Sequence, residues 1–274
     1  MNKKIISVII PAYNAEDTIE KCIESIKSSL AEIIVVDDGS QDNTFNICKK
    51  LSNKIDNLKI FSQQNKGQFF ARKLGLKQAT GKYIMFLDSD DFYEENTINR
   101  MLEVIKKYNE PDLVRFRFKK TIDGFCQYKY FEEEKMIKKQ DFPKQVYPMF
   151  LEGYMLNALW TNCVKREILE KIDIDVGNIR FGEDLLLSLE IFSKIENAVF
   201  IEDLLYNYVF KPSSVTNSKN KTKQLKNLKD SIEVYSTIYK YLLKWDMYNN
   251  ENICILNKRF KLVTDTIIKI LEEC

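Results

Sequence analysis

Apolar residues along the first 90 positions gather in short runs, and each run is followed by a polar loop and by apolar residues at helical spacing. The runs are residues 5–10, 32–36, 58–61 and 83–87, with helical spacing over 19–26, 44–51 and 70–76. This alternation predicts right-handed crossovers and a mainly parallel, doubly wound α/β sheet of Rossmann-like type. Ligands of such sheets bind at the carboxyl ends of the strands.

The later part of the chain is less regular. A helix is predicted over 94–108, and the alternation over 113–118 predicts a strand with one face in water. The charged run 132–135 indicates a solvated turn, and helical periodicity over 223–272 predicts two helices as a C-terminal appendage. We therefore expect a catalytic sheet domain over 1–215 and a helical region over 216–274.

Composition narrows the class of protein. The chain has 274 residues, is 45% hydrophobic and carries a net charge of +2, too little to argue for a nucleic-acid partner. Six scattered cysteines without a C-x-x-C pair argue against a zinc site or a disulfide framework. No run of about 18 apolar residues occurs, so we expect a cytoplasmic protein.

Histidine is absent from the chain. A Ser-His-Asp triad, a histidine-ligated metal and a histidine general base are therefore excluded. Any acid or base that works near neutral pH must be a carboxylate, a lysine, a cysteine or a tyrosine.

Three carboxylates follow the buried run 83–87 within four positions: Asp88, Asp90 and Asp91, with Ser89 between the first two. Carboxylates this close repel one another unless a cation lies between them, and oxygen ligands favour Mg²⁺ or Mn²⁺. The alternative is a capped turn that leads into the next helix. Because the polar loops at 13–14, 37–38 and 65 should meet at the same sheet edge, we favour the metal interpretation.

Glu183 and Asp184 open an apolar helix after Gly182. The simple interpretation is a favourable pair of charges at the positive end of a helix dipole. The functional interpretation is that one of them is a general base pointing into the cleft at the sheet edge. The helix by itself favours the simple interpretation.

Familiar nucleotide and calcium motifs do not fit. The chain has no G-x-G-x-x-G, the segment 75–83 has a phosphate-loop glycine one residue out of place, and an EF-hand that starts at Asp88 would lack its glycine and its final glutamate.

Four segments resemble, in order and approximate spacing, the motifs of family-2 glycosyltransferases with a GT-A fold. They are S-V-I-I-P-A-Y-N at 7–14, I-V-V-D-D-G-S at 34–40, N-x-G with Ala-Arg at 65–72, and D-S-D-D at 88–91. The resemblance is strong over 5–95 and looser through Trp160, Glu183-Asp184 and 206–214. It does not cover the C-terminal helices.

The resemblance implies a role for each matching residue. Asp38 would accept a hydrogen bond from the uracil N3–H, Asp90 would bind Mn²⁺ or Mg²⁺ directly, Asp88 would assist through ribose or water, and Asp184 would be the catalytic base. The implied nucleotide-binding residues are Pro11, Ala12, Tyr13, Asn14, Asp38, Asn65, Arg72, Asp88 and Ser89, and the implied metal ligands are Asp88 and Asp90.

Two positions depart from the family pattern. Lys73 stands where the family often has asparagine, and Lys211 stands where it often has arginine. Lysine lacks the planar fork with which arginine grips a phosphate, so the second departure leaves the phosphate contacts open.

The activity implied is inverting, metal-dependent transfer of a hexose from a nucleoside-diphosphate sugar, expected to be a UDP-sugar, to a hydroxyl of a glycan or lipid-linked acceptor. Cell-surface polysaccharide synthesis is the expected setting, with the inner face of the membrane as one place of action. The expected further partners are a membrane surface and a second copy of the chain through the C-terminal helices, but no nucleic acid. The alternatives are a nucleotidyltransferase, which the absence of basic residues in 11–14 disfavours, and a noncatalytic sugar-nucleotide-binding protein.

Overall fold

The computed structural model describes residues 4–122, 124–127, 129–152, 155–174, 179, 182–210 and 220–272. It divides into two compact units. The sheet unit comprises Met1–Ile137, Leu159–Ile172 and Lys194–Val209, and the helical unit comprises Lys138–Ala158, Asp173–Ser193 and Phe210–Cys274. Lys211 and the expected boundary between 215 and 216 lie outside the described residues.

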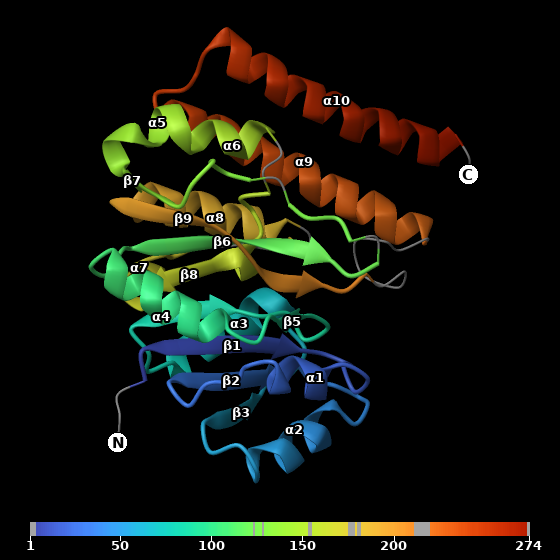
Figure 1. Ribbon diagram of the computed structural model, residues 1–274. Coiled ribbons are helices and arrows are strands. Elements are labelled where there is room, and N and C mark those ends of the chain that lie inside the picture. Colours follow the sequence, from blue (N-terminus) through green and yellow to red (C-terminus); the bar gives the residue numbers. More distant parts are fainter. Residues whose placement is uncertain are drawn as a thin grey trace. The chain divides into compact units, whose positions relative to one another are not determined.

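One sheet dominates the sheet unit, and its described strands are ordered β3-β2-β1-β4-β8-β6-β9-β5, with β7 also paired to β9 (Figure 1). The strands are β1 Ile6–Ala12, β2 Ala31–Asp37, β3 Leu58–Ser62, β4 Tyr83–Phe86, β5 Phe92–Tyr93, β6 Leu113–Lys120, β7 Lys135–Lys138, β8 Asn162–Lys165 and β9 Asn197–Tyr208. The four N-terminal strands pair in parallel. The predicted mainly parallel α/β sheet is confirmed.

Helices connect these parallel strands. The helices of the sheet unit are α1 Ile19–Glu24, α2 Thr44–Ser52, α3 Gln68–Gln78, α4 Thr97–Lys107 and α7 Arg166–Glu170, with a 3₁₀ turn at Leu159–Thr161. Every residue of β1, β2 and β4 is buried. Strands covered on both faces read as continuous apolar runs, and this pattern made these elements predictable.

The strand predicted with one wet face, β6, is instead buried over its first half. It lies between antiparallel β8 and parallel β9. Arg115 on this strand is fully buried and donates hydrogen bonds to the Tyr130 hydroxyl at 2.9 Å and to Asn162 Oδ1 at 2.8 Å. The alternation of apolar residues and arginine was misleading because these buried acceptors satisfy the guanidinium.

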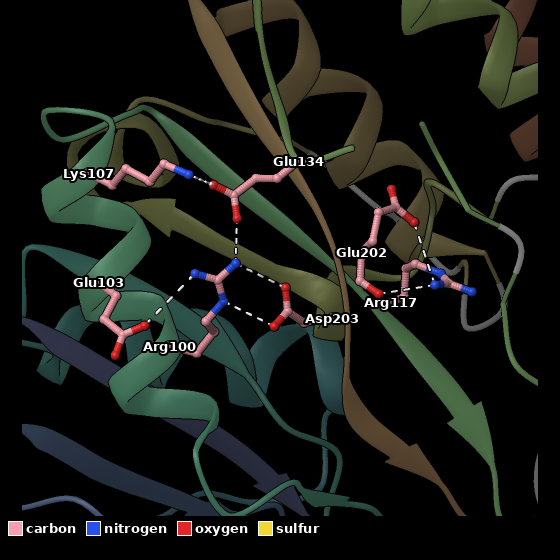
Figure 2. A network of polar contacts seen from close by, with 7 residues as sticks. All are labelled: Arg100, Glu103, Lys107, Arg117, Glu134, Glu202 and Asp203. Carbon is pink, nitrogen blue, oxygen red and sulfur yellow. Dashed lines mark hydrogen bonds and ion pairs between the residues drawn. The ribbon is translucent and has the colours of Figure 1, made fainter. Parts of the chain in front are cut away.

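Ion pairs join α4 to β9 and to Glu134, the residue before β7 (Figure 2). Arg100 on α4 donates to both carboxylate oxygens of Asp203 on β9, at 3.0 and 3.1 Å, and also pairs with Glu134. Lys107 donates to the same Glu134 at 2.8 Å. One residue of the predicted solvated turn at 132–135, Glu134, is therefore half-buried and takes part in this network of ion pairs.

The helical unit contains α5 Phe142–Gln145, α6 Tyr147–Glu152, α8 Glu183–Lys194, α9 Lys221–Lys244 and α10 Asn250–Glu272, with a 3₁₀ turn at Lys139–Asp141. Aliphatic and aromatic side chains form its core. Tyr147 stacks on Trp245 with ring centres 3.9 Å apart, and the Trp245 indole N–H donates to Ser193 Oγ at 2.9 Å. Helices α9 and α10 lie side by side, as the expected C-terminal pair (Figure 1).

None of the helices within the described residues has the length and apolar character that crossing a membrane requires.

Candidate functional site

The strand register brings the predicted polar loops to one edge of the sheet. Ala12 at the end of β1 pairs with Asp37 at the end of β2, which in turn pairs with Ser62 at the end of β3. Ile9 of β1 pairs with Phe86, two residues before Asp88. The loops after all four parallel strands therefore begin at the same carboxyl edge, the expected place for a ligand.

The loop after β1 is held against the loop after β2. Asn14 has a positive φ of 48°, a conformation that asparagine tolerates better than most residues. Its backbone N–H donates to Ser40 Oγ at 3.0 Å, and its side-chain oxygen accepts from the Gln41 N–H at 2.8 Å. The neighbouring Tyr13 is 47% exposed, so its ring is available at the sheet edge.

Asp38 organises the loop after β3. Its Oδ1 accepts from Gln63 Nε2 at 2.8 Å and from the Lys66 N–H at 2.9 Å, and its Oδ2 accepts from the Gly67 N–H at 2.8 Å. A carboxylate has about four acceptor positions, so three of them are used. These bonds fix the loop that contains Asn65 beside Asp38. The two predicted nucleotide-binding residues Asp38 and Asn65 therefore belong to the same hydrogen-bonded loop.

Arg72 and Asp88 meet directly. Arg72 lies on α3, is 3% exposed, and donates from Nη2 to Asp88 Oδ1 at 2.8 Å. A buried guanidinium paired with a half-buried carboxylate is a strong, oriented interaction. The structure thus joins two residues that are 16 positions apart in the sequence and that were both predicted in the nucleotide site.

The third carboxylate of the turn, Asp91, points elsewhere. It is 3% exposed, and it accepts from the Tyr206 hydroxyl at 2.5 Å and from the Val209 N–H at 2.7 Å. Burial, reinforced by the charges of Asp88 and Asp90, raises the pKa of Asp91 to about 8, although these two hydrogen bonds oppose the shift.

A divalent cation needs few protein ligands where a diphosphate supplies the others. Within the described part of the chain, no three acidic or cysteine side chains converge as a complete metal cage. Asp88 and Asp90 are half-buried at the sheet edge, and one Asp88 oxygen is committed to Arg72. This donor set fits a hard ion held by one or two carboxylates and by oxygens of a ligand.

Asp184, the predicted catalytic base, belongs to the helical unit. It occupies the first turn of α8 directly after Glu183, which is 4% exposed, whereas Asp184 is half-buried. The expected helix N-terminus is therefore confirmed. The role of Asp184 stays a prediction, as do the roles of the other site residues.

Sequence reasoning counted Asp91 among the crowded carboxylates of the turn but gave no role of their own to Asp91, Tyr206, Tyr208 or Trp160. Tyr206 and Tyr208 lie two apart on β9 and so share a face, and Trp160 stacks on Tyr206 with ring centres 4.3 Å apart. Burial and the charges of Asp91, Asp90 and Asp88 raise the pKa of Tyr208. The sequence does show alternating aromatic residues at 206 and 208. However, Asp91, the carboxylate that accepts from the Tyr206 hydroxyl, lies 115 positions away in the sequence.

The sheet order and the acidic turn after β4 are those of an α/β protein of the GT-A type. The family described as "Glycosyl transferase family 2" matches residues 7–159. The chain therefore belongs to glycosyl transferase family 2. The predicted family is confirmed. The predicted class of enzyme, glycosyltransferase, is confirmed as the class of that family.

Curated relatives carry related names. The chain is 28% identical to glycosyltransferase GlyA of Streptococcus pneumoniae over 77% of this chain and 31% of the relative. It is 30% identical to the uncharacterized glycosyltransferase EpsJ of Bacillus subtilis over 77% of this chain and 63% of the relative. It is 29% identical to the cholesterol galactosyltransferase of Borreliella burgdorferi over 80% of this chain and 63% of the relative. The chain thus spans less than two thirds of each.

A crystal structure of residues 1–349 of TarS from Staphylococcus aureus in complex with UDP-GlcNAc shares the fold. The TM-score is 0.71 at 23% identity, over 93% of this chain and 71% of TarS 1–349. The GT-A fold is confirmed by this likeness.

Proposed function

We propose that this chain catalyses inverting, metal-dependent transfer of a hexose from a UDP-sugar to a hydroxyl of a glycan or lipid-linked acceptor. The observation that carries the proposal is the grouping of Asp38, Arg72 and the D-x-D turn at one carboxyl edge of the sheet, within a family-2 chain. The structures of TarS with UDP-GlcNAc and with UDP support the choice of donor.

The names of relatives support the acceptor class. One relative is a cholesterol galactosyltransferase, and another, 27% identical over 88% of this chain, is the minor teichoic acid biosynthesis protein GgaB of Bacillus subtilis. The first name mentions a lipid, cholesterol, and the second mentions teichoic acid. We accordingly propose a hydroxyl acceptor on a glycan or a lipid carrier.

In the proposed reaction, Asp38 and the loop after β3 hold the uracil base through the one acceptor position that Asp38 has left. Arg72 orients Asp88 beside the ribose and the diphosphate. The bond between the anomeric carbon and the β-phosphate oxygen breaks, and UDP leaves with the electron pair. A new bond forms from the acceptor oxygen on the opposite face, which inverts the anomeric carbon.

Asp184 accepts the proton of the acceptor hydroxyl in this proposal. A divalent cation bound by Asp90 and assisted by Asp88 would supply positive charge against the departing diphosphate. Mn²⁺ and Mg²⁺ both suit oxygen ligands.

The experiment that tests the proposal measures UDP binding by calorimetry with Mn²⁺ and with EDTA. Wild-type protein should bind UDP more tightly in Mn²⁺, and Asp90→Ala should lose this gain because it lacks the proposed direct ligand. Saturation with UDP and Mn²⁺ at about 100 times the dissociation constant should stabilise the fold by about 2.7 kcal/mol.

A matched control is Asp56→Ala, which removes an exposed carboxyl before β3. Unchanged Mn²⁺-dependent affinity in Asp90→Ala would refute the metal role. A wild-type protein that binds UDP but releases none from any UDP-sugar with acceptor mixtures would favour the noncatalytic binding protein.

A further inference from the structure

One tyrosine hydroxyl holds both ends of the D-x-D turn. The Asp91 N–H donates to the Asp88 carbonyl at 3.0 Å, which closes residues 88–91 into a turn. The Tyr206 hydroxyl oxygen accepts from the Asp88 N–H in a long bond of 3.4 Å, and the hydroxyl donates to Asp91 Oδ2 at 2.5 Å. The first and the last residue of the turn are therefore fixed by the same atom.

A second bond anchors the turn to the same strand. The other carboxylate oxygen of Asp91 accepts from the Val209 N–H at 2.7 Å, directly after the end of β9. Both oxygens of Asp91 are thus directed to β9, and the residue is buried. Asp88 and Asp90 remain half-buried at the sheet edge, so the turn separates a structural carboxylate from the two proposed ligand residues.

The Tyr206 ring has little freedom to move. It is fully buried, with Trp160 stacked on its face at 4.3 Å and with Tyr93 edge-on at 5.8 Å between ring centres. Close packing of this kind fixes a side chain in one rotamer. The hydroxyl is consequently a rigid reference point for the turn.

The turn needs such support because its carboxylates repel one another. In the absence of a cation, Asp88 and Asp90 would move apart if the backbone allowed it, and a bound ion would then have to bring them back. Groups behind the ligands that fix the ligand geometry commonly change metal affinity by about 10- to 100-fold. We propose that Tyr206 and Asp91 are positioning residues that hold the D-x-D turn ready for a divalent cation and the donor diphosphate. This inference rests on the proposed function.

The test compares Tyr206→Phe with Tyr83→Phe. Tyr83 is also fully buried, and its hydroxyl donates to the Pro111 carbonyl at 2.9 Å at the opposite end of β4, so each variant removes one buried hydroxyl and keeps its ring. Tyr206→Phe loses two hydrogen bonds and Tyr83→Phe loses one, so Tyr206→Phe should lose at least as much thermal stability. Calorimetry then measures the affinity for UDP in Mn²⁺ and for uridine, which has no phosphate.

We expect Tyr206→Phe to weaken UDP binding in Mn²⁺ by about tenfold, the order of one lost buried hydrogen bond, with unchanged uridine binding. Tyr83→Phe should change neither affinity. Asp91→Asn keeps the size of the side chain but has one oxygen for two donors, and it should shift UDP binding in the same direction. It serves as the second variant if Tyr206→Phe does not fold.

Equal UDP affinity in wild type, Tyr206→Phe and Asp91→Asn would overturn the positioning role and leave the proposed function intact. Parallel losses of uridine and UDP affinity would also overturn it, because they would show a general disturbance. Wild-type protein without Mn²⁺-dependent UDP binding would overturn both proposals.

Discussion

The aspartates at the candidate site have different surroundings, and these surroundings determine the chemistry of each carboxylate. Asp38 is committed to the loop after β3, Asp88 to Arg72, and Asp91 to β9. Asp184 stands in the first turn of a helix, where a negative charge is already favourable. Its simple and functional interpretations therefore have to be separated by experiment.

Asp184→Asn should lower the rate of transfer by about 100- to 10,000-fold, the usual contribution of a general base, because the amide cannot take the acceptor proton. UDP affinity in Mn²⁺ should stay near that of the wild type. Steady-state transfer assays and calorimetry measure the two quantities. The control is Glu183→Gln, which removes a charge from the same helix end and should keep most of the activity. Similar activity in the two variants would leave only the dipole interpretation.

Glu32 provides a pH-dependent contribution to stability. Burial raises its pKa, but hydrogen bonds from Lys59, Ser7 and Thr80 outweigh burial, and the pKa lies below the ordinary 4.5. A lowered pKa in the folded state means that the stabilisation is present above about pH 4.5 and is lost as the pH falls through the folded pKa.

We expect Glu32→Gln to reduce the free energy of unfolding at pH 7 by about 1 to 3 kcal/mol and to flatten its decline below pH 4.5. Urea titrations from pH 7 to pH 3 give this free energy. Glu167→Gln, an exposed carboxyl on α7, is the control. An equally steep acid decline in Glu32→Gln and wild type would contradict the assignment.

Elements with local signals were the predictable ones. Apolar runs and helical spacing predicted the first four strands and their helices, and helical periodicity predicted the two C-terminal helices. Strand β8 had no comparable signal, yet it pairs with both β4 and β6 in antiparallel fashion. Its place, and the burial of Arg115 beside it, depend on pairing partners that lie far away in the sequence.

Helix α3 packs closely against the sheet at Gly75. A Cβ at this position would lie 2.4 Å from Ile9 Cγ2 and 3.4 Å from Val36 Cγ2. Gly75→Ala should therefore destabilise the fold by about 1 to 3 kcal/mol, although alanine favours a helix by about 1 kcal/mol over glycine. Denaturant unfolding measures the difference, with Lys77→Ala on the exposed side of α3 as control. A stabilised Gly75→Ala would mean that the helix can retreat from the sheet at little cost.

At the scale of the whole molecule, each of the two units is assembled from three separate segments of the chain. The sheet unit combines Met1–Ile137 with Leu159–Ile172 and Lys194–Val209. Much of its stability therefore comes from contacts between segments that are distant in the sequence. Such topologies fold slowly relative to helical ones and depend on the complete arrangement. Buried side chains of the sheet should consequently become accessible mainly through broad opening of the structure.

The labelling rates of the cysteine thiols measure this opening of the structure. Cys22, Cys48 and Cys163 are buried and Cys126 and Cys254 are exposed, all five as free thiols. Burial raises the pKa of each of the three buried thiols, that of Cys48 to about 12. In the folded protein, iodoacetamide should modify the exposed pair several thousandfold faster, because stability of about 5 kcal/mol leaves few molecules open.

Peptide mass spectrometry at a series of reaction times measures these rates. Labelling in guanidinium provides the control, in which all five thiols should react alike. Rapid labelling of Cys22 in the folded protein would contradict its packing beside the Asp88 carbonyl, which lies 3.5 Å from the Cys22 sulfur.

The sequence by itself determined the strand and helix alternation, the absence of histidine chemistry and the placement of acidic loops at the carboxyl ends of parallel strands. These features follow from local periodicity and from residue types next to one another in the chain. Only the tertiary structure decided that Asp38 holds the loop after β3, that Arg72 pairs with Asp88, and that Tyr206 and Val209 hold Asp91. Those contacts join positions far apart in the sequence, and the order and register of the strands set them rather than any local preference.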